Sequence, residues 1–380
     1  MSFRISRIQT RVVEHMFHKN LLKLYGGKLR GGVRHLWVTV HAKNGCRGHG
    51  EGAVTLTWSG EKPEIAQWIV DHLFAPRLVG PTFDHPREAL AIMDTTLYGN
   101  PFVKGAVDTA IWDLWSRLQN VSAAEFFRNR KPAASIPTRA ALVPGSVAQT
   151  IRMARAFWKQ GIRTLKFKIG SPPFGDVARL RAVRDELGNE PVFTLDANCA
   201  YPTADKAVAA IEALMPFGIA LVEQPTPRDR IRMMAEVRRR VDIPVMADES
   251  VFSPDQLAEA LDCDAIDIVA LSPGKNGGFT HSVDMADTLL KAGKACSLGC
   301  NLETDLGQAS MACLAANHSS FPIEQIACDL PAATLFQHSA ITSPIAFHDG
   351  RVGVPQGAGF GVNPAVGTSS DLISGEACSA

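Results

Sequence analysis

The sequence lacks the features that define several large classes of protein. It has no run of about 18 apolar residues, so we expect no transmembrane helix. Its 39 Lys and Arg residues nearly balance its 38 Asp and Glu residues, and a net charge of +1 favours binding neither to nucleic acid nor to a membrane surface. The N-terminus shows no apolar segment of signal-peptide length. We therefore expect a cytoplasmic protein whose partners are small molecules.

The chain contains eight cysteines but lacks the cysteine spacing of a zinc site or a disulfide framework. They occur at Cys46, Cys199, Cys263, Cys296, Cys300, Cys313, Cys328 and Cys378. Because most of them lie in apolar stretches, we interpret them as reduced, buried thiols. A reactive cysteine is the alternative, but no motif in the sequence supplies a group that would activate one.

The first part of the chain shows strand patterns and then helix patterns. Residues 1–58 alternate apolar and polar residues and contain the turn sequence Asn44-Gly45. Three amphipathic stretches with helical periodicity follow, at 63–74, 86–97 and 105–118. Strands followed by helices predict a small α+β domain.

From about residue 133 the pattern changes to strands that alternate with helices. Eight apolar, strand-like runs occur, at 136–142, 164–170, 192–198, 220–225, 244–250, 266–272, 295–300 and 323–329. The polar residues near the ends of the second to sixth runs follow one another at intervals of 28, 27, 25 and 24 residues, as repeated βα units would. We therefore predict an α/β fold, a (β/α)8-type TIM barrel. An open doubly wound sheet is the alternative, but the Gly-rich nucleotide turn that it needs is missing.

These patterns predict two domains. An α+β capping domain spans residues 1–130, and the barrel spans residues 131–349. The turn-rich end of the chain, residues 350–380, is expected to pack back on the capping domain and complete it.

Carboxylates stand at the same place in three consecutive βα units. Asp196, Glu223 and Asp248 each close an apolar run, and active residues of such barrels lie at the carboxyl ends of the strands. Three carboxylates that converge on one point repel one another unless a cation lies between them. An all-oxygen set favours a hard ion, Mg²⁺ first and Mn²⁺ as the alternative. Helix N-capping explains any one of the three equally well, but it is a poor explanation of all three together.

Two lysines end the strand that precedes these carboxylates. Lys166 and Lys168 are two residues apart, so their side chains point to the same face of a strand. Two ammonium groups beside each other and near a divalent cation disfavour protonation, which would make Lys168 a general base. Ion pairs with Asp196 and Glu223 are the structural alternative, and for Lys166 both interpretations can hold.

The motifs as a set resemble those of a known family over nearly the whole chain. They are similar to the muconate lactonising (muconate cycloisomerase) branch of the enolase superfamily. TLKFKIG resembles the K-x-K strand of that branch, and TLDAN, LVEQP and MADES resemble its three metal strands. The further landmarks are GHGEG, AVDTAIWDL, KNGG, NLETDLG and GVPQGAGFGV.

The resemblance implies an enzyme that removes a proton next to a substrate carboxylate with the help of Mg²⁺. It implies that Lys168 is the acid/base on one face of the substrate and that Lys166 tunes it. It also implies that the metal ligands are Asp196, Glu223 and Asp248.

Other roles follow from the same resemblance. Asn198 would support the metal site, and Glu303 would orient the substrate from the far side of the pocket. The loop at 18–32 would set specificity, and its basic residues, Lys19 among them, would bind a second anionic group of the substrate. A solvated charged surface is an equal explanation of that loop. Because relatives commonly form homo-oligomers, we expect one here.

One position departs from the family pattern. The branch carries a lysine five residues before the Gly-Gly pair, where this chain has Ser272, and Lys275 follows three residues later. Racemisation needs acid/base groups on both faces of the α-carbon, so Ser272 disfavours a two-base racemase. Both residues stay candidate substrate contacts. The mandelate racemase branch would carry a histidine on the seventh strand, and ACSLGCN has none.

We therefore predict a one-base isomerase or lyase, with cycloisomerase-like chemistry as the first choice. Dehydration of a sugar acid or hydroxy acid is the alternative among enzymes. A non-catalytic protein that binds a metal and a ligand in the same pocket is the alternative from another class. Ser272 favours that last interpretation, and the retained lysines and carboxylates disfavour it.

Overall fold

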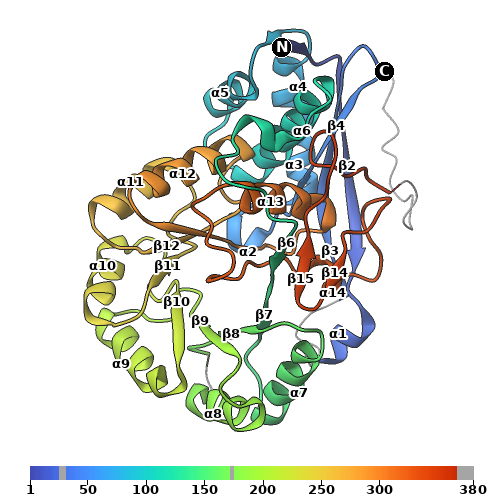
Figure 1. The fold of residues 1–380 in the computed structure, drawn as a ribbon. Helices are drawn as coiled ribbons and strands as arrows, with labels where there is room; N and C mark the ends of the chain where they lie inside the picture. The colour runs from blue at the N-terminus through green and yellow to red at the C-terminus, as the bar shows by residue number, and fades with distance from the viewer. Residues whose placement is uncertain (25–30, 172–174, 366–380) are drawn as a thin grey trace.

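The computed structural model describes residues 1–24, 31–171 and 175–365. Its first part contains an antiparallel sheet with the strand order β2-β3-β4, formed by Arg7–Met16, Gly32–His41 and Arg47–Gly52. Gly45 lies in the tight turn between β3 and β4 and donates its backbone N–H to the carbonyl of Ala42 at 3.2 Å. The predicted hairpin is therefore confirmed. Figure 1 shows this sheet in blue beside the barrel.

Helices cover one face of this sheet. The longest, α6 (Pro101–Leu118), is buried over most of its length. It lies flush against β4 because glycines leave room there: a Cβ on Gly48 would lie 2.2 Å from the carbonyl oxygen of Ala110, and one on Gly50 would lie 2.1 Å from that of Ala106. The other elements of this part are β1 (Phe3–Arg4), α1 (Lys19–Leu24), α2 (Leu56–Ser59), α3 (Pro63–Ile69), a π-helical segment (Val70–Phe74), α4 (Ala75–Leu78), β5 (Thr82–Phe83), α5 (Pro86–Thr96) and a 3-10 turn (Ala123–Phe126). The three predicted helical stretches are confirmed.

We expect Gly50→Ala to destabilise the protein, because β4 and α6 would have to separate to admit a methyl group. Overpacking of this kind typically costs about 1–3 kcal/mol. The free energy of unfolding in urea should fall by about that amount. Gly175→Ala is the matched control, since among the described residues the nearest atom to its added Cβ would be 3.9 Å away, on Ala178. Equal stability of the two variants would show that the contact between strand and helix is loose.

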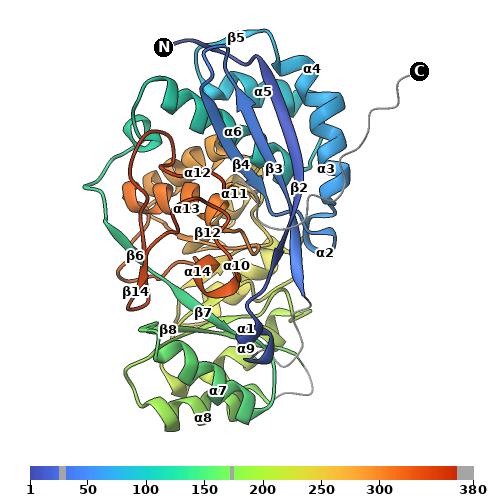
Figure 2. The same cartoon turned by 90° about the vertical axis from the view of Figure 1, so that its right-hand side faces the viewer.

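The second part is a barrel of parallel strands with helices outside it, as Figures 1 and 2 show. Its sheet has the order β13-β12-β11-β10-β9-β8-β7, so each strand pairs with its neighbour in the chain. The strands are β7 (Arg139–Leu142), β8 (Thr164–Lys168), β9 (Val192–Asp196), β10 (Ile219–Glu223), β11 (Val245–Ala247), β12 (Ile268–Leu271) and β13 (Ala295–Leu298). The helices are α7 (Val147–Trp158), α8 (Asp176–Leu187), α9 (Ala204–Leu214), a 3-10 turn (Met215–Phe217), α10 (Ile231–Arg240), α11 (Pro254–Asp262), α12 (Phe279–Lys291), α13 (Asp305–Asn317) and α14 (Ala332–Leu335). The predicted capped α/β barrel is confirmed.

The eighth predicted strand, at 323–329, is not a regular strand, and this part of the prediction was wrong. A turn keeps the first half of the segment out of the sheet. At its end, the N–H of Cys328 donates to the carbonyl of Pro137 at 3.0 Å, beside β7. The N–H of Asp329 donates to the carbonyl of Leu298 in β13 at 3.1 Å. The N–H of Arg139 in β7 also donates to the carbonyl of Cys328 at 3.0 Å, so these backbone hydrogen bonds join the edges of the barrel in place of a strand.

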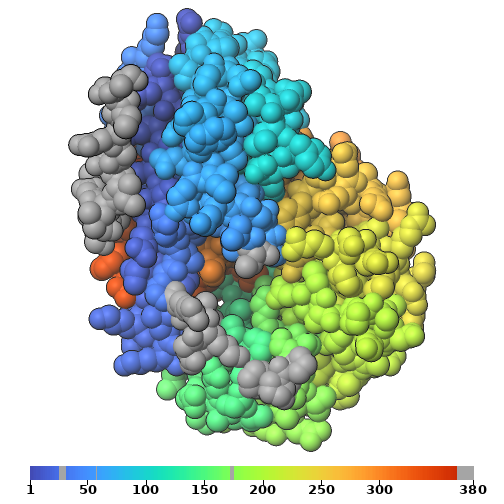
Figure 3. Space-filling view, turned by 180° about the vertical axis from the view of Figure 1, so that it is seen from behind, coloured from blue at the N-terminus to red at the C-terminus, as the bar shows by residue number. Residues whose placement is uncertain are grey.

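The end of the described chain returns to the cap. The strands β14 (Phe347–His348) and β15 (Arg351–Gly353) form a small antiparallel sheet with β6 (Ser135–Pro137). Beyond them, the N–H of Phe360 donates to Oδ1 of Asp113 in α6 at 2.9 Å. The domain limits at residues 130 and 349 stay predictions. Figure 3 shows the surface of the first hundred residues lying directly against the barrel. Among the described residues, no helix is long and apolar enough to cross a membrane.

Candidate active site

The predicted metal ligands lie at the carboxyl end of the barrel. Asp196 and Glu223 are the last residues of β9 and β10, and Asp248 follows β11 directly. In the sheet register, Asp196 lies between Lys168 on one side and Glu223 on the other. All four residues, with Lys166, line a cavity of about 170 Å³. The parallel strands bring them together because each ends at the same edge of the sheet.

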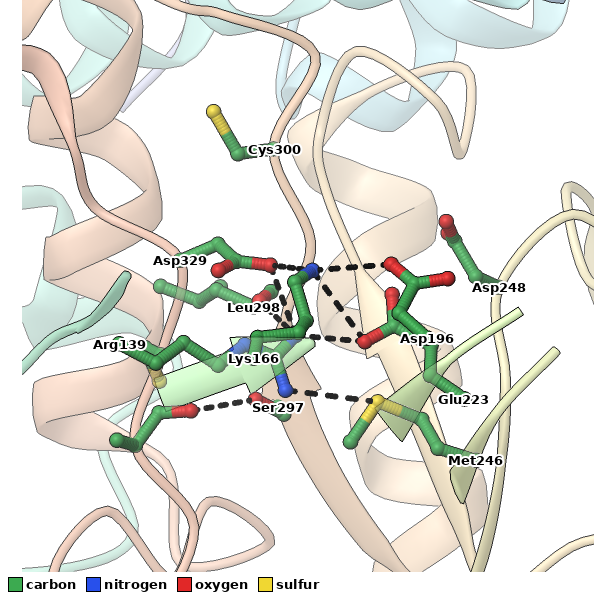
Figure 4. A network of polar contacts seen from close by, with 12 residues as sticks. Arg139, Lys166, Asp196, Glu223, Met246, Asp248, Ser297, Leu298, Cys300 and Asp329 are labelled. Atoms are coloured by element: carbon green, nitrogen blue, oxygen red, sulfur yellow. Dashed lines mark hydrogen bonds and ion pairs between the residues drawn. The ribbon is translucent and has the colours of Figure 1, made fainter. Parts of the chain in front are cut away.

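A buried ion network fills the barrel below this cavity. Nζ of Lys166 lies 2.6 Å from Oδ2 of Asp329, 3.3 Å from Asp196 and 3.4 Å from Glu223. The guanidinium of Arg139 lies 2.8 Å from Asp329 and 3.1 Å from Glu223. Figure 4 shows the Lys166 amine between these carboxylates. Lys166 therefore makes the ion pairs that were the structural alternative for it.

Arg139 and Asp329 were not predicted as site residues. The signal for both was present, because each is a charge inside or directly after an apolar run of the sequence. Burial would raise the pKa of Asp329, but Arg139 and Lys166 hold it well below the usual range of a carboxyl. Burial and Arg139 act to lower the pKa of Lys166, but Asp329 and the neighbouring carboxylates raise it above its usual value. Lys166 is therefore a fixed cation.

Lys168 is the accessible member of the lysine pair. Its side chain is 26% exposed, against 6% for Lys166. Nζ of Lys168 lies 2.6 Å from Oδ2 of Asp196 and 2.6 Å from Oδ1 of Asn198. Asn198 in turn donates from Nδ2 to Oε1 of Glu249 at 3.0 Å. The side-chain amide of Asn198 therefore orients Lys168 through its oxygen and Glu249 through its nitrogen.

The chemistry of the donor set fits a hard divalent cation. Burial and the nearby Asp196 raise the pKa of Glu223 to about 7. Burial, Asp248 and Asp196 raise the pKa of Glu249 to about 7 as well. Oε2 of Glu249 is buried and has no hydrogen-bond partner within the described part of the chain. A cation bound between these carboxylates would relieve both the repulsion and the loss of solvation.

The three predicted ligands are not gathered as tightly as an ion would hold them. Within the described ranges, no choice of one carboxylate oxygen from each of Asp196, Glu223 and Asp248 brings all three oxygens within 4.8 Å of one another. Asp196 is bound by Lys168, and Asp248 is bound by Lys275. In Figure 4 the Asp248 carboxylate lies apart from the dashed network around Lys166.

Ser272, Lys275 and Glu303, which were predicted to contact the substrate, lie in two different places. Oγ of Ser272 donates to Oε1 of Glu303 at 3.2 Å, and burial raises the pKa of that carboxyl. Lys275 is fully buried, and its Nζ donates to the carbonyl and Oδ1 of Asp248 at 3.0 and 2.8 Å and also to the carbonyl of Ala270. The amine of Lys275 therefore points at a predicted metal ligand and not into the cavity.

The cap contributes Trp58, which the sequence did not indicate as a site residue. Trp58 of α2 lines the cavity together with Asn301 and Cys300. Burial raises the pKa of the Cys300 thiol well above its usual value, so this cysteine is not a reactive thiolate.

Lys19 of the predicted specificity loop is exposed on α1. Lys28 and Arg30 of the predicted specificity loop lie outside the described residues. The seven described cysteines form no disulfide.

A capped barrel with carboxylates and lysines at its strand ends defines an enolase-like enzyme. The chain belongs to the mandelate racemase/muconate lactonizing enzyme family of the enolase superfamily. Residues 149–366 match the family described as Enolase C-terminal domain-like, and residues 30–127 match Mandelate racemase / muconate lactonizing enzyme, N-terminal domain. Members of this superfamily use a divalent metal ion.

Relatives with two kinds of reaction resemble the chain about equally. Muconate cycloisomerase 1 of Rhodococcus opacus is 30% identical over 86% of this chain and 87% of its own. L-Ala-D/L-Glu epimerase of Bacillus subtilis is 27% identical over 86% and 88%. The substrate-liganded structure of that epimerase has a TM-score of 0.87 at 26% identity over 96% and 99% of the two chains. The protein is thus an enzyme of the isomerase group, and the predicted muconate branch is not singled out.

A further relative shows which ion a member of the family holds. The dipeptide epimerase of Enterococcus faecalis was solved in complex with Mg and the dipeptide L-Leu-L-Tyr. Its structure has a TM-score of 0.84 at 25% identity and covers 94% of this chain and 99% of its own.

Proposed function

We propose that the protein is a Mg²⁺-dependent isomerase that abstracts the proton α to a substrate carboxylate with one base, Lys168, in cycloisomerase-like chemistry. One observation carries this proposal. Among the described lysines at the strand ends, Lys168 has an amine that is both held at the cavity and partly exposed. Lys166 is locked in the ion network, and Lys275 is buried against Asp248. Ser272 stands where the family branch carries a lysine, which would face the other side of the substrate.

The proposed roles follow from the contacts. Asp196, Glu223 and Asp248 would hold the ion, which supplies electrostatic stabilisation of the negative charge that develops on the substrate carboxylate. Lys166 stays protonated and holds two of these carboxylates in place. Lys168 would take the α-proton of a lactone while the bond between its β-carbon and the ring oxygen breaks and releases a carboxylate. In the direction of ring closure that bond forms, and protonated Lys168 delivers the proton to the same face of the α-carbon.

Dehydration of a hydroxy acid is the second candidate, and the pair Ser272–Glu303 favours it. Burial raises the pKa of the Glu303 carboxyl, and that is the direction that a general acid for a leaving hydroxyl requires. The hydroxyl of Ser272 lies between this carboxyl and the loop that follows β12. Both candidates use one base, and the presence or absence of released water separates them.

The test is α-proton exchange in D₂O, followed by NMR with a panel of mono- and dicarboxylates, with and without Mg²⁺. We expect exchange with at least one acid that requires Mg²⁺ and is lost on chelation with EDTA. Mg²⁺-independent exchange would contradict the role of the carboxylates. Failure of every acid in the panel would favour a protein that only binds a ligand in this pocket.

The configuration of the product is expected to reveal a single base. Because the cavity has one partly exposed amine, the α-carbon of the product should carry deuterium on one face only. Chiral chromatography and NMR of the product check this expectation. A racemic product would contradict it and would show that a second group, Lys275 or Glu303, reaches the other face.

A further inference from the structure

A second group of metal-ligating side chains lies in the cap sheet. His15 on β2, His35 on β3 and Glu51 on β4 are all buried. One ring nitrogen of each histidine and one carboxylate oxygen of Glu51 lie within 4.8 Å of one another, and no other three His, Cys, Asp or Glu residues in the described ranges do so. None of the three lines the cavity at the barrel strand ends.

The strand register places these side chains on one face of the sheet. His35 pairs with Val13, and His15 lies two residues farther along β2, so the two imidazoles are diagonal neighbours. Their ring centroids are 5.4 Å apart. Trp37 lies on the same face as His35 and pairs directly with Glu51 on β4. The convergence is therefore built into the pairing of three strands.

Trp37 and Thr304 donate hydrogen bonds to Glu51, but hydrogen bonding does not account for one ring nitrogen of each histidine. Nε2 of His15 and Nδ1 of His35 are buried and have no hydrogen-bond partner within the described structure. Such atoms are rare in folded proteins and call for an unseen ion or water. Nδ1 of His35 lies 3.3 Å from Oε1 of Glu51 without hydrogen-bond geometry. That separation is close to the ~3.3 Å between two ligands that each lie ~2.0–2.1 Å from a tetrahedral metal ion.

The protonation states and the surroundings also suit metal ligands. Burial lowers the pKa of His15 to about 4, which leaves its ring neutral at pH 7. Burial would raise the pKa of Glu51, but the adjacent His35 lowers it to about 2, so this carboxylate is ionised. Glu51 accepts hydrogen bonds from the N–H of Thr304 at 2.7 Å and from Nε1 of Trp37 at 3.1 Å. Outer hydrogen bonds of this kind orient a ligating carboxylate.

We infer that His15, His35 and Glu51 form a second metal site, which takes a zinc-like transition-metal ion and not Mg²⁺. Two imidazoles with one carboxylate are a ligand set for such ions, whereas Mg²⁺ prefers oxygen alone. Thr304 caps the start of α13 and also bonds to Glu51. The ion would therefore fix the cap sheet to the barrel helix that follows Glu303.

Zinc retention by the purified full-length protein tests this inference. The protein is stripped with chelator, saturated with Mg²⁺, incubated with Zn²⁺ and desalted, and its metal content is measured by plasma mass spectrometry. We expect about one zinc ion per chain in the wild type and less than a tenth of that in His15→Gln and in His35→Gln. His49→Gln is the matched control, since His49 lies on β4 but outside the group, and it should retain zinc.

X-ray absorption at the zinc edge of the wild-type protein provides a readout that does not depend on the folding of any variant. A first shell with two imidazole nitrogens is expected. No retained zinc in the wild type, a shell of oxygen atoms alone, or equal retention in the folded His15→Gln variant would each overturn the site. A buried histidine pair packed beside Glu51, with His35 in contact with the carboxylate, would then remain as the account of this group.

Discussion

The variant Lys168→Ala is expected to lose α-proton exchange by about 10²–10⁴-fold, the range over which a positioned general base contributes. The physical reason is the position of the amine. Nζ of Lys168 is fixed at the cavity by Asp196 and Asn198, each at 2.6 Å. Lys166 also lines this cavity, but its side chain is 6% exposed and held by carboxylates, against 26% for Lys168. The exchange rate in D₂O with saturating Mg²⁺ and substrate measures the loss.

A measurement of Mg²⁺ binding shows whether the variant has lost only its base or the whole site. Calorimetric titration should show that Lys168→Ala still binds Mg²⁺, because none of the predicted ligands is removed. Added methylamine should restore part of the exchange, since a small amine fits the space that the side chain leaves. Lys159→Ala, an exposed lysine at the end of α7, is the matched control and should behave as the wild type. Unchanged exchange in Lys168→Ala would refute the one-base proposal.

The variant Asp329→Asn is expected to lower the free energy of unfolding by about 3–5 kcal/mol, the usual cost of removing one partner of a buried ion pair. Asp329 neutralises two buried cations, Lys166 at 2.6 Å and Arg139 at 2.8 Å. Asparagine keeps the shape of the side chain and removes its charge. Glu223 would be the remaining carboxylate that contacts both cations, at 3.4 and 3.1 Å. Urea denaturation at neutral pH measures the change.

The same substitution should also weaken Mg²⁺ binding, because Lys166 and Arg139 would then compete with the ion for Glu223. Asp264→Asn is the matched control. Asp264 forms ion pairs with Arg238 and Lys294 at the surface, and its backbone φ of 50° suits asparagine. We expect little change in its stability. An Asp329→Asn variant as stable as the wild type would show that the network does not depend on this charge.

The repeating spacing of the sequence predicted most of the fold. Apolar runs about 25 residues apart, each closed by a polar residue, correspond to strands β8 to β12. That information is local, because a buried parallel strand needs apolar side chains on both faces. The eighth strand could not be predicted correctly. Cys328 and Asp329 close the barrel with backbone hydrogen bonds. Every residue has the same backbone groups, so a pattern of side chains cannot predict these bonds.

The sequence also placed the candidate site residues at strand ends but not their partners. Asp329 and Arg139 are 190 residues apart in the chain and meet only because the first and last parts of the barrel are adjacent. Lys275 gave no sign of where its amine would go, and only the folded loop turns it onto Asp248. The sequence offered GHGEG only as a family landmark, and the structure shows that its glycines allow close packing of β4 on α6.

The sequence by itself determined that this protein is a capped α/β barrel with three carboxylates and two lysines at consecutive strand ends, because strand periodicity and strand termini are local properties. Only the tertiary structure decided which lysine presents its amine to the cavity. That choice depends on long-range charges: Asp329 and Glu223 hold Lys166, Asp248 holds Lys275, and Lys168 alone of the three stays partly exposed.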